Sequence, residues 1–423
     1  MAKSTVVAES SSAIVSDPGS WLSERNRVLL ALFLLLIPAF ALTALTTRAY
    51  RREQQRLAAQ ASTDGEIALR HGRAGDAVVA LRTAMSLAAT RSRRLRLAQA
   101  LAAAGRDAEA RAHLLTLREG TPGDGLINLE LARLAARDAD VPHAARYYRD
   151  AIEGAWDRAP DTRRREARLE LADLLVRHGP RAAAEGELIA LAADLPPDPG
   201  LHIRVGDLLM EAQQVRRAFD VYTAALRLDP ASVRAAQGAG ESAFALANYV
   251  TARRYFAQVA AAEPTNTHVL GRLEVVTAVI GLDPFARGLS ARERARRATV
   301  AFETATKRLA ACADAVGAPI QNVAPPRESL GARPAGIGGD ARNPAETSTE
   351  PGRDELQDLA AGAQALAPQA QPIAIARDPD LLDQVMDLVF RVEEITARRC
   401  GEAQDRADQA LVLIARDRRA TER

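Results

Sequence analysis

The strongest regularity in the pattern of hydrophobic and polar positions is a set of small residues that recurs with a period of about 34 residues. The first series consists of Gly65, Ala98, Ala132, Ala172, Gly206 and Gly240. The second series lies twelve residues later each time and consists of Ala77, Ala110, Ala144, Ala184, Ala218 and Ala252. Two antiparallel helices approach closely only where side chains are small, so the two series predict repeated helical hairpins. One step in each series is longer than the others and predicts a six-residue insertion near 154–164.

Larger apolar residues follow the second series by four positions, which is one helical turn. They are Leu81, Leu114, Tyr148, Leu188, Tyr222 and Phe256. We expect them to fill the core between neighbouring hairpins. Prolines stand at one phase of the repeat, where a proline ends the second helix; they are Pro122, Pro196, Pro230 and Pro264. The pattern predicts about six and a half repeats over residues 58–282.

An uncharged apolar run, Val28 to Leu45, precedes the repeats. Its 18 residues approach the roughly 20 that cross a bilayer as a helix. Aromatic and basic residues flank both ends, as at membrane surfaces; they are Trp21, Arg25, Arg27, Arg48, Tyr50, Arg51 and Arg52. We expect a transmembrane helix at 28–46, between a disordered tail at 1–27 and a juxtamembrane segment at 47–57. The alternative is a cleavable signal peptide, although no clear small-x-small site follows the run.

The orientation of this helix is harder to predict. More basic residues follow the run than precede it, which taken alone would keep the repeats in the cytoplasm. Long domains, however, cross membranes regardless of flanking charge. The short segment before the helix and the pair of thiols favour a single-pass protein of the inner (plasma) membrane with its large domain on the periplasmic side.

The last third of the chain departs from the repeat. Ser290 and Glu293 predict a capping box that opens a long helix, and we expect a capping helix at 283–316 over the end of the stack. Residues 317–352 lose periodicity and are rich in proline and glycine, with some serine. This composition predicts a disordered linker.

A helical region is expected at 353–423. A helix should begin at Asp378 and end near Arg399, because an apolar stripe follows helical spacing there; its members are Leu381, Val385, Leu388, Val389, Val392 and Ile395. With a last helix at 405–415 it would form a hairpin that docks on the capping helix. The alternative is a separate module that recruits its own partner or self-associates through the exposed stripe.

Composition narrows the classes of fold and function. The 423 residues are 48% hydrophobic and only 4% aromatic, and much of the apolar fraction is alanine, which favours an all-α fold. The 56 basic residues nearly balance the 54 acidic ones, so no cationic field favours nucleic acid as a partner. Cys312 and Cys400 are the only thiols. They could form one disulfide or remain two buried thiols, depending on the compartment.

Residues 201–230 show one repeat most clearly. The residues that carry the pattern are Gly206, Leu209, Ala218, Tyr222, Ala225 and Pro230. In them the chain resembles the tetratricopeptide repeat (TPR) family, although the family's usual tryptophan is absent throughout and Gln213 stands where a turn glycine is common. The resemblance covers about half of the chain and implies a right-handed α-solenoid of helical hairpins.

The resemblance also implies a binding surface, since the first helix of each unit in this family lines a concave groove. The residues at the groove positions are Glu66, Arg70, Gln99, Arg133, Arg137, Asp173, Arg177, Asp207, Glu211, Gln237 and Glu241. Apolar residues between them would form a strip; they are Leu129, Leu169, Ile203, Met210 and Phe244. Arginines dominate the first half of this set and acids the second, so we hypothesise a peptide ligand with unlike-charged ends. The alternative is a set of ordinary solvated helix faces.

No pattern of catalytic, cofactor-binding or metal-ligating residues occurs in the sequence. The six histidines fall at different phases of the repeat and form no HExxH or cysteine–histidine cluster. We therefore expect a non-enzymatic scaffold or adaptor that binds a protein or peptide, assists a cell-envelope complex, and uses no cofactor, nucleic acid or small-molecule substrate. Two alternatives stay open: a structural spacer that self-associates through the C-terminal hairpin, and a regulatory subunit of a separate enzyme.

Overall fold

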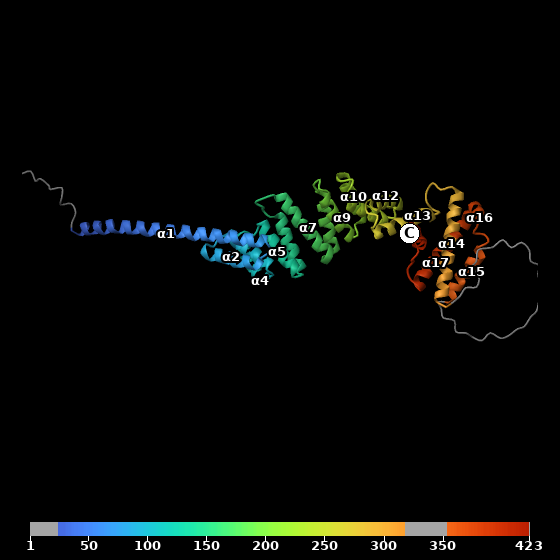
Figure 1. Cartoon of the computed structure of the whole chain (residues 1–423), viewed down its shortest axis with the longest axis horizontal. Helices are drawn as coiled ribbons and strands as arrows, with labels where there is room; N and C mark the ends of the chain where they lie inside the picture. The colour runs from blue at the N-terminus through green and yellow to red at the C-terminus, as the bar shows by residue number, and fades with distance from the viewer. Residues whose placement is uncertain (1–23, 318–352, 423) are drawn as a thin grey trace, which may run out of the picture. The chain divides into compact units, whose positions relative to one another are not determined.

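Every regular element is a helix in the part of the chain that the structure describes, residues 24–317 and 353–422 (Figure 1). The structure is a computed structural model, and it divides into two compact units, residues 1–167 and 168–423. The helices wholly within the first unit are α1 (Glu24–Arg70), α2 (Ala74–Leu87), α3 (Arg91–Ala103), α4 (Asp107–Gly120), α5 (Gly125–Arg137) and α6 (Val141–Glu153). The unit boundary falls inside α7 (Pro160–His178). The following repeat helices are α8 (Arg181–Ala193), α9 (Pro199–Glu211), α10 (Val215–Leu228), α11 (Val233–Ala245), α12 (Tyr249–Ala262) and α13 (Thr267–Leu282). The predicted all-α solenoid of helical hairpins is confirmed.

The apolar run and the first helix of the first hairpin belong to one continuous helix, α1. Among the described residues, only this helix is long and apolar enough to cross a membrane, and its most apolar window is wholly unburied. Length and composition of this kind are shared by anchors and signal sequences. Pro38 lies inside the helix without ending it. Residues 24–27 of the predicted tail and the whole segment 47–57 are also helical, while residues 1–23 lie outside the described chain.

The helices of each hairpin cross at the two series of small residues, as predicted. Every member of the second series is at most 1% exposed. The larger apolar residue lies directly on the first series, because a Cβ added at Gly206 would lie 2.7 Å from Cε1 of Tyr222, and one at Gly240 would lie 2.8 Å from Cε1 of Phe256. Tyr222 also contacts the position of Gly238 in the next first helix. Both rings therefore fill their own hairpin, and Tyr222 also fills the space between neighbouring hairpins.

The short turn between the two helices of a hairpin uses a residue with positive φ. Gly72 and Gly105 supply it in the first two hairpins, each at φ 72°. Ala139, Gln213 and Ala247 take the same place at φ 58°, 60° and 56°, where a side chain costs roughly 1–2 kcal/mol. Gln213 thus adopts the conformation of the glycine that the repeat pattern lacks at this position.

The insertion of the fourth unit falls at the connecting segment 154–159 and at the start of α7, which has 19 residues against 13 residues in α5 and in α9. Trp156 of this segment packs its indole on Gly125, where an added Cβ would collide with the ring. Its Nε1 donates a hydrogen bond of 2.9 Å to the carbonyl of Ala151. The insertion is therefore held against the third hairpin, formed by α5 and α6.

The end of the second unit is a bundle that packs on α13. Its helices are α14 (Ala291–Ala315), α15 (Arg353–Leu366), α16 (Pro372–Arg377), α17 (Pro379–Cys400) and α18 (Arg406–Glu422). Ser290 caps α14 by accepting a hydrogen bond from the backbone N–H of Glu293. The Glu293 carboxylate accepts hydrogen bonds from Arg296 and Arg297, so one half of the predicted capping box forms.

The last helix, α18, packs chiefly against α13 and only secondarily against α17. Arg406 lies 3.2 Å from Glu274 of α13, and the Tyr249 hydroxyl donates a 2.6 Å hydrogen bond to Asp417. The sequence predicted a simple hairpin of the last two helices over 378–399 and 405–415. The structure instead places α18 beside the final repeat helix and adds the short helix α16, which the sequence did not predict.

The apolar stripe of α17 is part of the core of this bundle. Its six members are at most 8% exposed and share one hydrophobic cluster with residues of α13, α14, α15, α16 and α18. The exposed stripe that motivated a self-associating module is therefore absent, because these side chains bury their apolar surface within the chain. Except for Gly317, the predicted linker 317–352 lies outside the described residues.

A disulfide and an ion pair join α14 to α17. Cys312 and Cys400 form the disulfide, with their Cα atoms 5.8 Å apart. One turn before Cys312, the Arg308 guanidinium pairs with the carboxylate of Glu393 and donates to the carbonyl of Gly401 at 3.3 Å. The two helices are thus linked covalently and electrostatically at neighbouring levels.

Candidate functional site

All eleven residues predicted to line a groove lie on first helices of the hairpins. Glu66 and Arg70 are on α1, Gln99 on α3, Arg133 and Arg137 on α5, Asp173 and Arg177 on α7, Asp207 and Glu211 on α9, and Gln237 and Glu241 on α11. Each is half-buried or exposed, next to the buried small residues of the hairpin core. They are therefore placed where polar side chains can meet both solvent and the neighbouring first helix.

In the first unit, polar contacts join consecutive first helices at these positions. Arg96 of α3 lies 3.2 Å from the Glu66 carboxylate of α1. The Gln99 amide donates a 3.0 Å hydrogen bond to Glu130 of α5, and Glu130 also lies 3.8 Å from Arg133. The predicted residues thus belong to a polar ladder that runs from α1 to α5.

Two arginines proposed for ligand binding already have carboxylate partners within the chain. Arg137 donates to Asp107 at 2.8 Å and to the carbonyl of Ala102 at 3.3 Å. Arg177 donates to Asp173 at 2.7 Å, one turn earlier on α7. A ligand carboxylate at either arginine would compete with these pairs, which are exposed and individually weak.

In the second unit, Asp207 of α9 is held from two sides. The hydroxyl of Tyr222 donates to it at 2.6 Å, and Arg234 of α11 donates at 2.9 Å. Burial, followed by the hydrogen bond to Asp207, raises the pKa of Tyr222 above its ordinary value. The hydrogen bond to Asp207 likewise raises the pKa of Arg234. Asp207 therefore links the hairpin core to the next first helix.

The same arrangement recurs one repeat later at Glu241 of α11. His268 of α13 lies 2.9 Å from this carboxylate and Arg272 lies 3.4 Å from it. The Arg272 guanidinium also covers the ring of Phe244 at 4.3 Å from its centroid. The acidic character predicted for this part of the groove is thus partly balanced by basic side chains from the following repeat.

Two predicted residues remain open to a ligand. Arg70 on α1 and Glu211 on α9 are exposed, and neither forms an ion pair within the described part of the chain. A third predicted residue, Gln237 on α11, is half-buried rather than exposed.

The apolar strip is shorter than predicted. Leu129 and Leu169 are 1% and 4% exposed, so they belong to the core and the prediction that they line a groove is wrong. Ile203, Met210 and Phe244 are partly buried and pack against the core of the second unit. Ile203 stands at the same repeat position as the two leucines, three residues before the small residue of the first series, so the repeat position alone does not determine which side chains are exposed.

The partners of the predicted residues were missed, although their spacing carried a signal. Arg96 follows Glu66 by nearly one repeat, and Glu130 follows Gln99 by a similar separation of 31. Arg234 follows Asp207 by 27 positions, as His268 follows Glu241. These separations are close to one repeat, so each partner falls on the next first helix. Comparing charges one repeat apart would have predicted the ladder.

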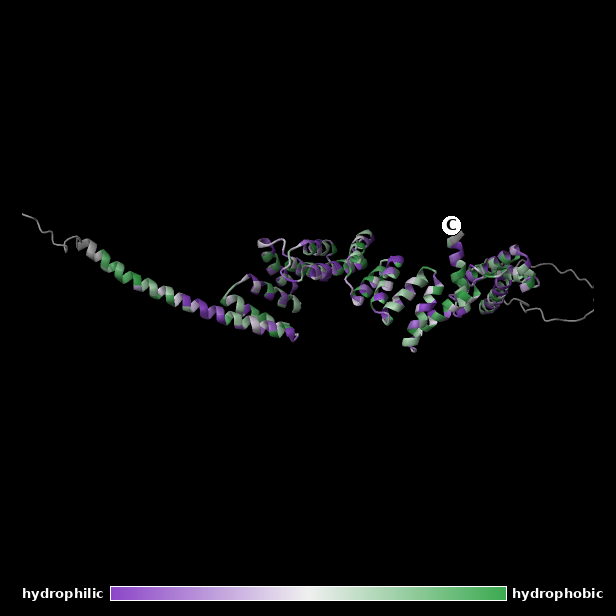
Figure 2. Ribbon diagram, turned by 90° about the horizontal axis from the view of Figure 1, so that it is seen from above, coloured by the Kyte–Doolittle hydropathy of each residue, from purple (hydrophilic) through white to green (hydrophobic). Residues whose placement is uncertain are grey.

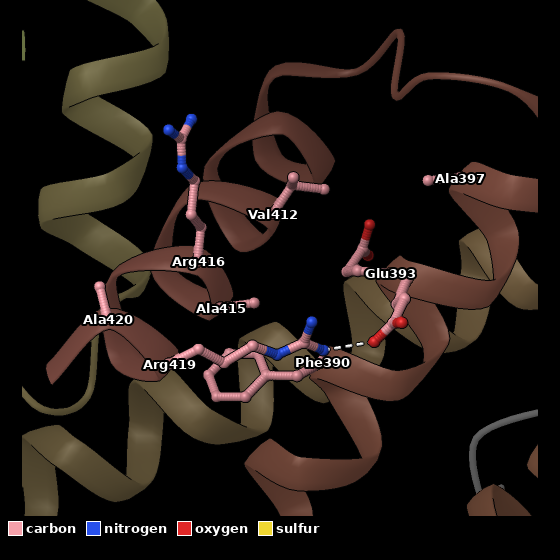
Figure 3. Close-up of a pocket in the computed structure, with 9 residues that line it drawn as sticks. Phe390, Glu393, Ala397, Val412, Ala415, Arg416, Arg419 and Ala420 are labelled. Atoms are coloured by element: carbon pink, nitrogen blue, oxygen red, sulfur yellow. Dashed lines mark hydrogen bonds and ion pairs between the residues drawn. The ribbon is translucent and has the colours of Figure 1, made fainter. Parts of the chain in front are cut away.

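A second candidate site is a cavity of about 610 Å³ between α17 and α18 (Figure 3). Its walls are formed by Phe390, Glu393, Glu394, Ala397, Val412, Ala415, Arg416, Arg419 and Ala420. An ion pair between Arg419 and Glu394 lies among these lining residues. The mostly apolar wall suits an apolar group, and within the described residues no cluster of three or more metal-ligating side chains occurs here or elsewhere.

Glu393 is the buried charge of this cavity wall, with a side chain only 1% exposed. One oxygen pairs with Arg308, while Oε1 has no hydrogen-bond partner within the described residues. Desolvation raises the pKa of Glu393 to about 7, against the opposing effect of Arg308. The nearby carboxylate of Asp408 adds to this rise in the pKa of Glu393.

No family model and no curated protein matches this sequence. Among similar solved structures, YrrB, described as a TPR protein with an unusual peptide-binding site, is 14% identical with a TM-score of 0.37, over 45% of this chain and 95% of that one. PilW, described as a type IV pilus biogenesis factor, is 18% identical with a TM-score of 0.39, over 52% of this chain and 98% of that one. PilF of Pseudomonas aeruginosa is 19% identical with a TM-score of 0.33, over 45% and 84%. By its own geometry, two antiparallel helices in each unit of about 34 residues, this chain has tetratricopeptide-type repeats.

Proposed function

We propose that the chain is a membrane-anchored scaffold that binds a protein or peptide along the inner faces of its repeats and helps to assemble or organise a cell-envelope complex, without catalysing a reaction. The observation that carries this proposal is the alternation of polar and half-buried apolar side chains on consecutive first helices. Met210 and Glu211 on α9 are one example, since a half-buried thioether stands beside an exposed carboxylate. Surfaces of this kind bind extended or helical peptides through apolar anchors and charge complementarity.

The charges that remain open refine the chemistry of the partner. Glu211 in the second unit favours a basic side chain of the ligand, whereas Arg70 in the first unit favours an acidic one. Asp207 and Glu241 already have basic neighbours, so they contribute less net attraction. Within each unit, the open charge is thus proposed to select the ligand, Arg70 in the first unit and Glu211 in the second, and the residues that are already paired would serve mainly to keep neighbouring first helices in register.

The anchor is proposed to be α1, in the inner membrane, with the repeats on the periplasmic side. The exposed apolar surface of α1 supports a membrane span. The disulfide between Cys312 and Cys400 supports an oxidising compartment for the large domain, because structural disulfides are rare in the cytosol. Alkylation of intact cells before and after reduction tests this placement. Two thiols that react without reduction would place the domain in the cytoplasm.

Site-specific photo-crosslinking in the native membrane tests the binding proposal. A photoreactive residue at Glu211 should give a discrete adduct, whereas one at Arg227, exposed on the second helix α10, should not. A Glu211→Arg variant should lose the adduct when the probe is moved to Gln237, while Arg227→Glu should keep it. Equal labelling at Glu211 and Arg227, or no adduct at either, contradicts binding at the inner face.

A further inference from the structure

Three arginines of α1 stand directly after the apolar run: Arg48, Arg51 and Arg52, here called the arginine cluster. All three are exposed, and none forms an ion pair or side-chain hydrogen bond within the described residues. The repeat arginines Arg137 and Arg177, by contrast, each have a carboxylate partner. The arginine cluster is therefore open to an anion from outside the chain.

The helix places the arginine cluster on one side of α1. At about 100° per residue, Arg48, Arg51 and Arg52 fall within an arc of about 100°, and Tyr50 falls roughly opposite its centre. Figure 2 shows the apolar stretch of α1 followed at once by a strongly hydrophilic one, before α2 packs against the helix. The change from apolar to charged sequence is sharp because the run of 18 uncharged residues ends at Leu45.

The heights of these residues match the surface of a bilayer. With a rise of about 1.5 Å per residue, the Cα atoms of Arg48, Arg51 and Arg52 lie about 4.5, 9 and 10.5 Å beyond Leu45. The headgroup layer on each side of a bilayer is about 5–7 Å thick. Side chains on a helix lean toward its N-terminus, which on α1 is the direction of the apolar run. Long arginine side chains can thus bring all three guanidinium groups back to the level of the lipid phosphates.

We propose that the arginine cluster binds the phosphate groups of anionic phospholipids. This inference rests on the membrane span in the proposed function. Guanidinium groups form paired, charge-assisted hydrogen bonds with phosphate oxygens, and an anionic headgroup adds the net charge that a zwitterionic one lacks. Tyr50, 66% exposed, stands at the same height, where aromatic side chains are common at membrane surfaces.

The lipid contacts would also orient the first hairpin. No break separates Arg52 from the part of α1 that packs against α2. Glu66 and Arg70 follow Arg48 by about five and about six helical turns, which returns them to about the same face of the helix. Lipids that fix the rotation of α1 at the arginine cluster therefore fix the direction of the inner face of the first hairpin.

Electron paramagnetic resonance on the full chain tests the proposal. The chain is reconstituted in phosphatidylcholine vesicles that contain a trace of spin-labelled phosphatidylglycerol or spin-labelled phosphatidylcholine, and the immobilised fraction of each label is measured. We expect wild type to associate with phosphatidylglycerol about three- to five-fold more strongly than with phosphatidylcholine. One arginine near the surface raises the affinity for an anionic lipid by a factor of about five at most. The preference should fall in high salt.

Three triple variants separate the effect of charge at the arginine cluster from the effect of net charge. Arg48→Gln/Arg51→Gln/Arg52→Gln should lose the preference, and the corresponding lysine variant should keep most of it. A control that neutralises three exposed arginines of the second unit, Arg216→Gln/Arg227→Gln/Arg253→Gln, should behave as wild type. Equal immobilisation of both lipids by wild type, or no change in the cluster variant, overturns the proposal. Failure of the chain to resist alkaline carbonate extraction would instead overturn the membrane span.

Discussion

Replacing Arg308 with methionine should loosen the C-terminal bundle in a pH-dependent way. Arg308 and Glu393 have side chains only 10% and 1% exposed. Methionine keeps the apolar stem of the arginine but removes its charge. The Glu393 carboxylate would then be buried with neither oxygen paired, because Oε1 has no partner among the described residues even in the wild type.

The size of the loss follows from the state of Glu393. Desolvation raises its pKa from 4.5 to about 7 in the folded chain, and Arg308 acts to lower it. A carboxyl group with a raised folded pKa contributes stability at low pH that is lost as the pH rises from about 4.5 to about 7. Without Arg308 the folded pKa rises further, so Glu393 is protonated at pH 5 with or without the arginine. We expect a loss of about 1 kcal/mol at pH 5, for one hydrogen bond, and about 3–5 kcal/mol at pH 8.

Hydrogen–deuterium exchange of the full chain in detergent measures this loss. Protection of α17 amides gives the free energy of local opening, and comparing variants at one pH cancels the intrinsic exchange rates. The double variant Arg308→Met/Glu393→Leu should recover most of the stability at pH 8, since apolar replacement of both partners is often neutral. Arg419→Met, which breaks the half-exposed pair with Glu394, should cost at most about 1 kcal/mol. Equal losses at pH 5 and pH 8, or a double variant as unstable as the single one, would refute the reasoning.

Further changes test the repeats and the disulfide. Gln213→Gly should stabilise its hairpin by about 1 kcal/mol, because the turn residue has φ 60°; thermal unfolding should show a higher midpoint. Gly240→Ala should destabilise by about 1–3 kcal/mol through the contact with Phe256, whereas Gly186→Ala, where an added Cβ meets nothing within 4 Å, should stabilise by up to about 1 kcal/mol in the same assay. Cys400→Ser removes the covalent link to Cys312, 88 positions away. It should lower the free energy of unfolding of α17 by up to about 4–5 kcal/mol. Limited proteolysis that cuts wild type and variant alike would contradict this.

The repeats could be predicted from the sequence because their determinants are local and periodic. Gly206 and Tyr222 lie on the two helices of one hairpin, so the contact between them follows from spacing alone. Capping and turn signals are also local, as Ser290 and Gln213 illustrate. The continuity of the apolar run with the first repeat helix was missed, although no proline or glycine between Leu45 and Ala58 interrupts a helix there.

The candidate site was harder to predict than the fold. Spacing identified which helix faces carry Arg137 and Asp207, but it could not determine whether their charges were free. The partners Asp107 and Arg234 lie 30 and 27 positions away, and their side chains reach the site only through the packing of separate helices. The net charge of a surface is therefore overestimated when each helix is considered alone.

The C-terminal bundle shows where periodic reasoning ends. Glu274 lies one repeat after Gly240, at the position where earlier repeats have a small buried residue that contacts their second helix. The helix that follows α13 in sequence, α14, contacts it only weakly, and α18 packs there instead, with Arg406 beside Glu274. An acidic residue at this position is compatible with α18 because the helix presents a guanidinium to it. The final repeat is thus completed by a helix from far along the chain, since Arg406 and Glu274 are 132 positions apart, which explains why no local pattern could have predicted the pairing.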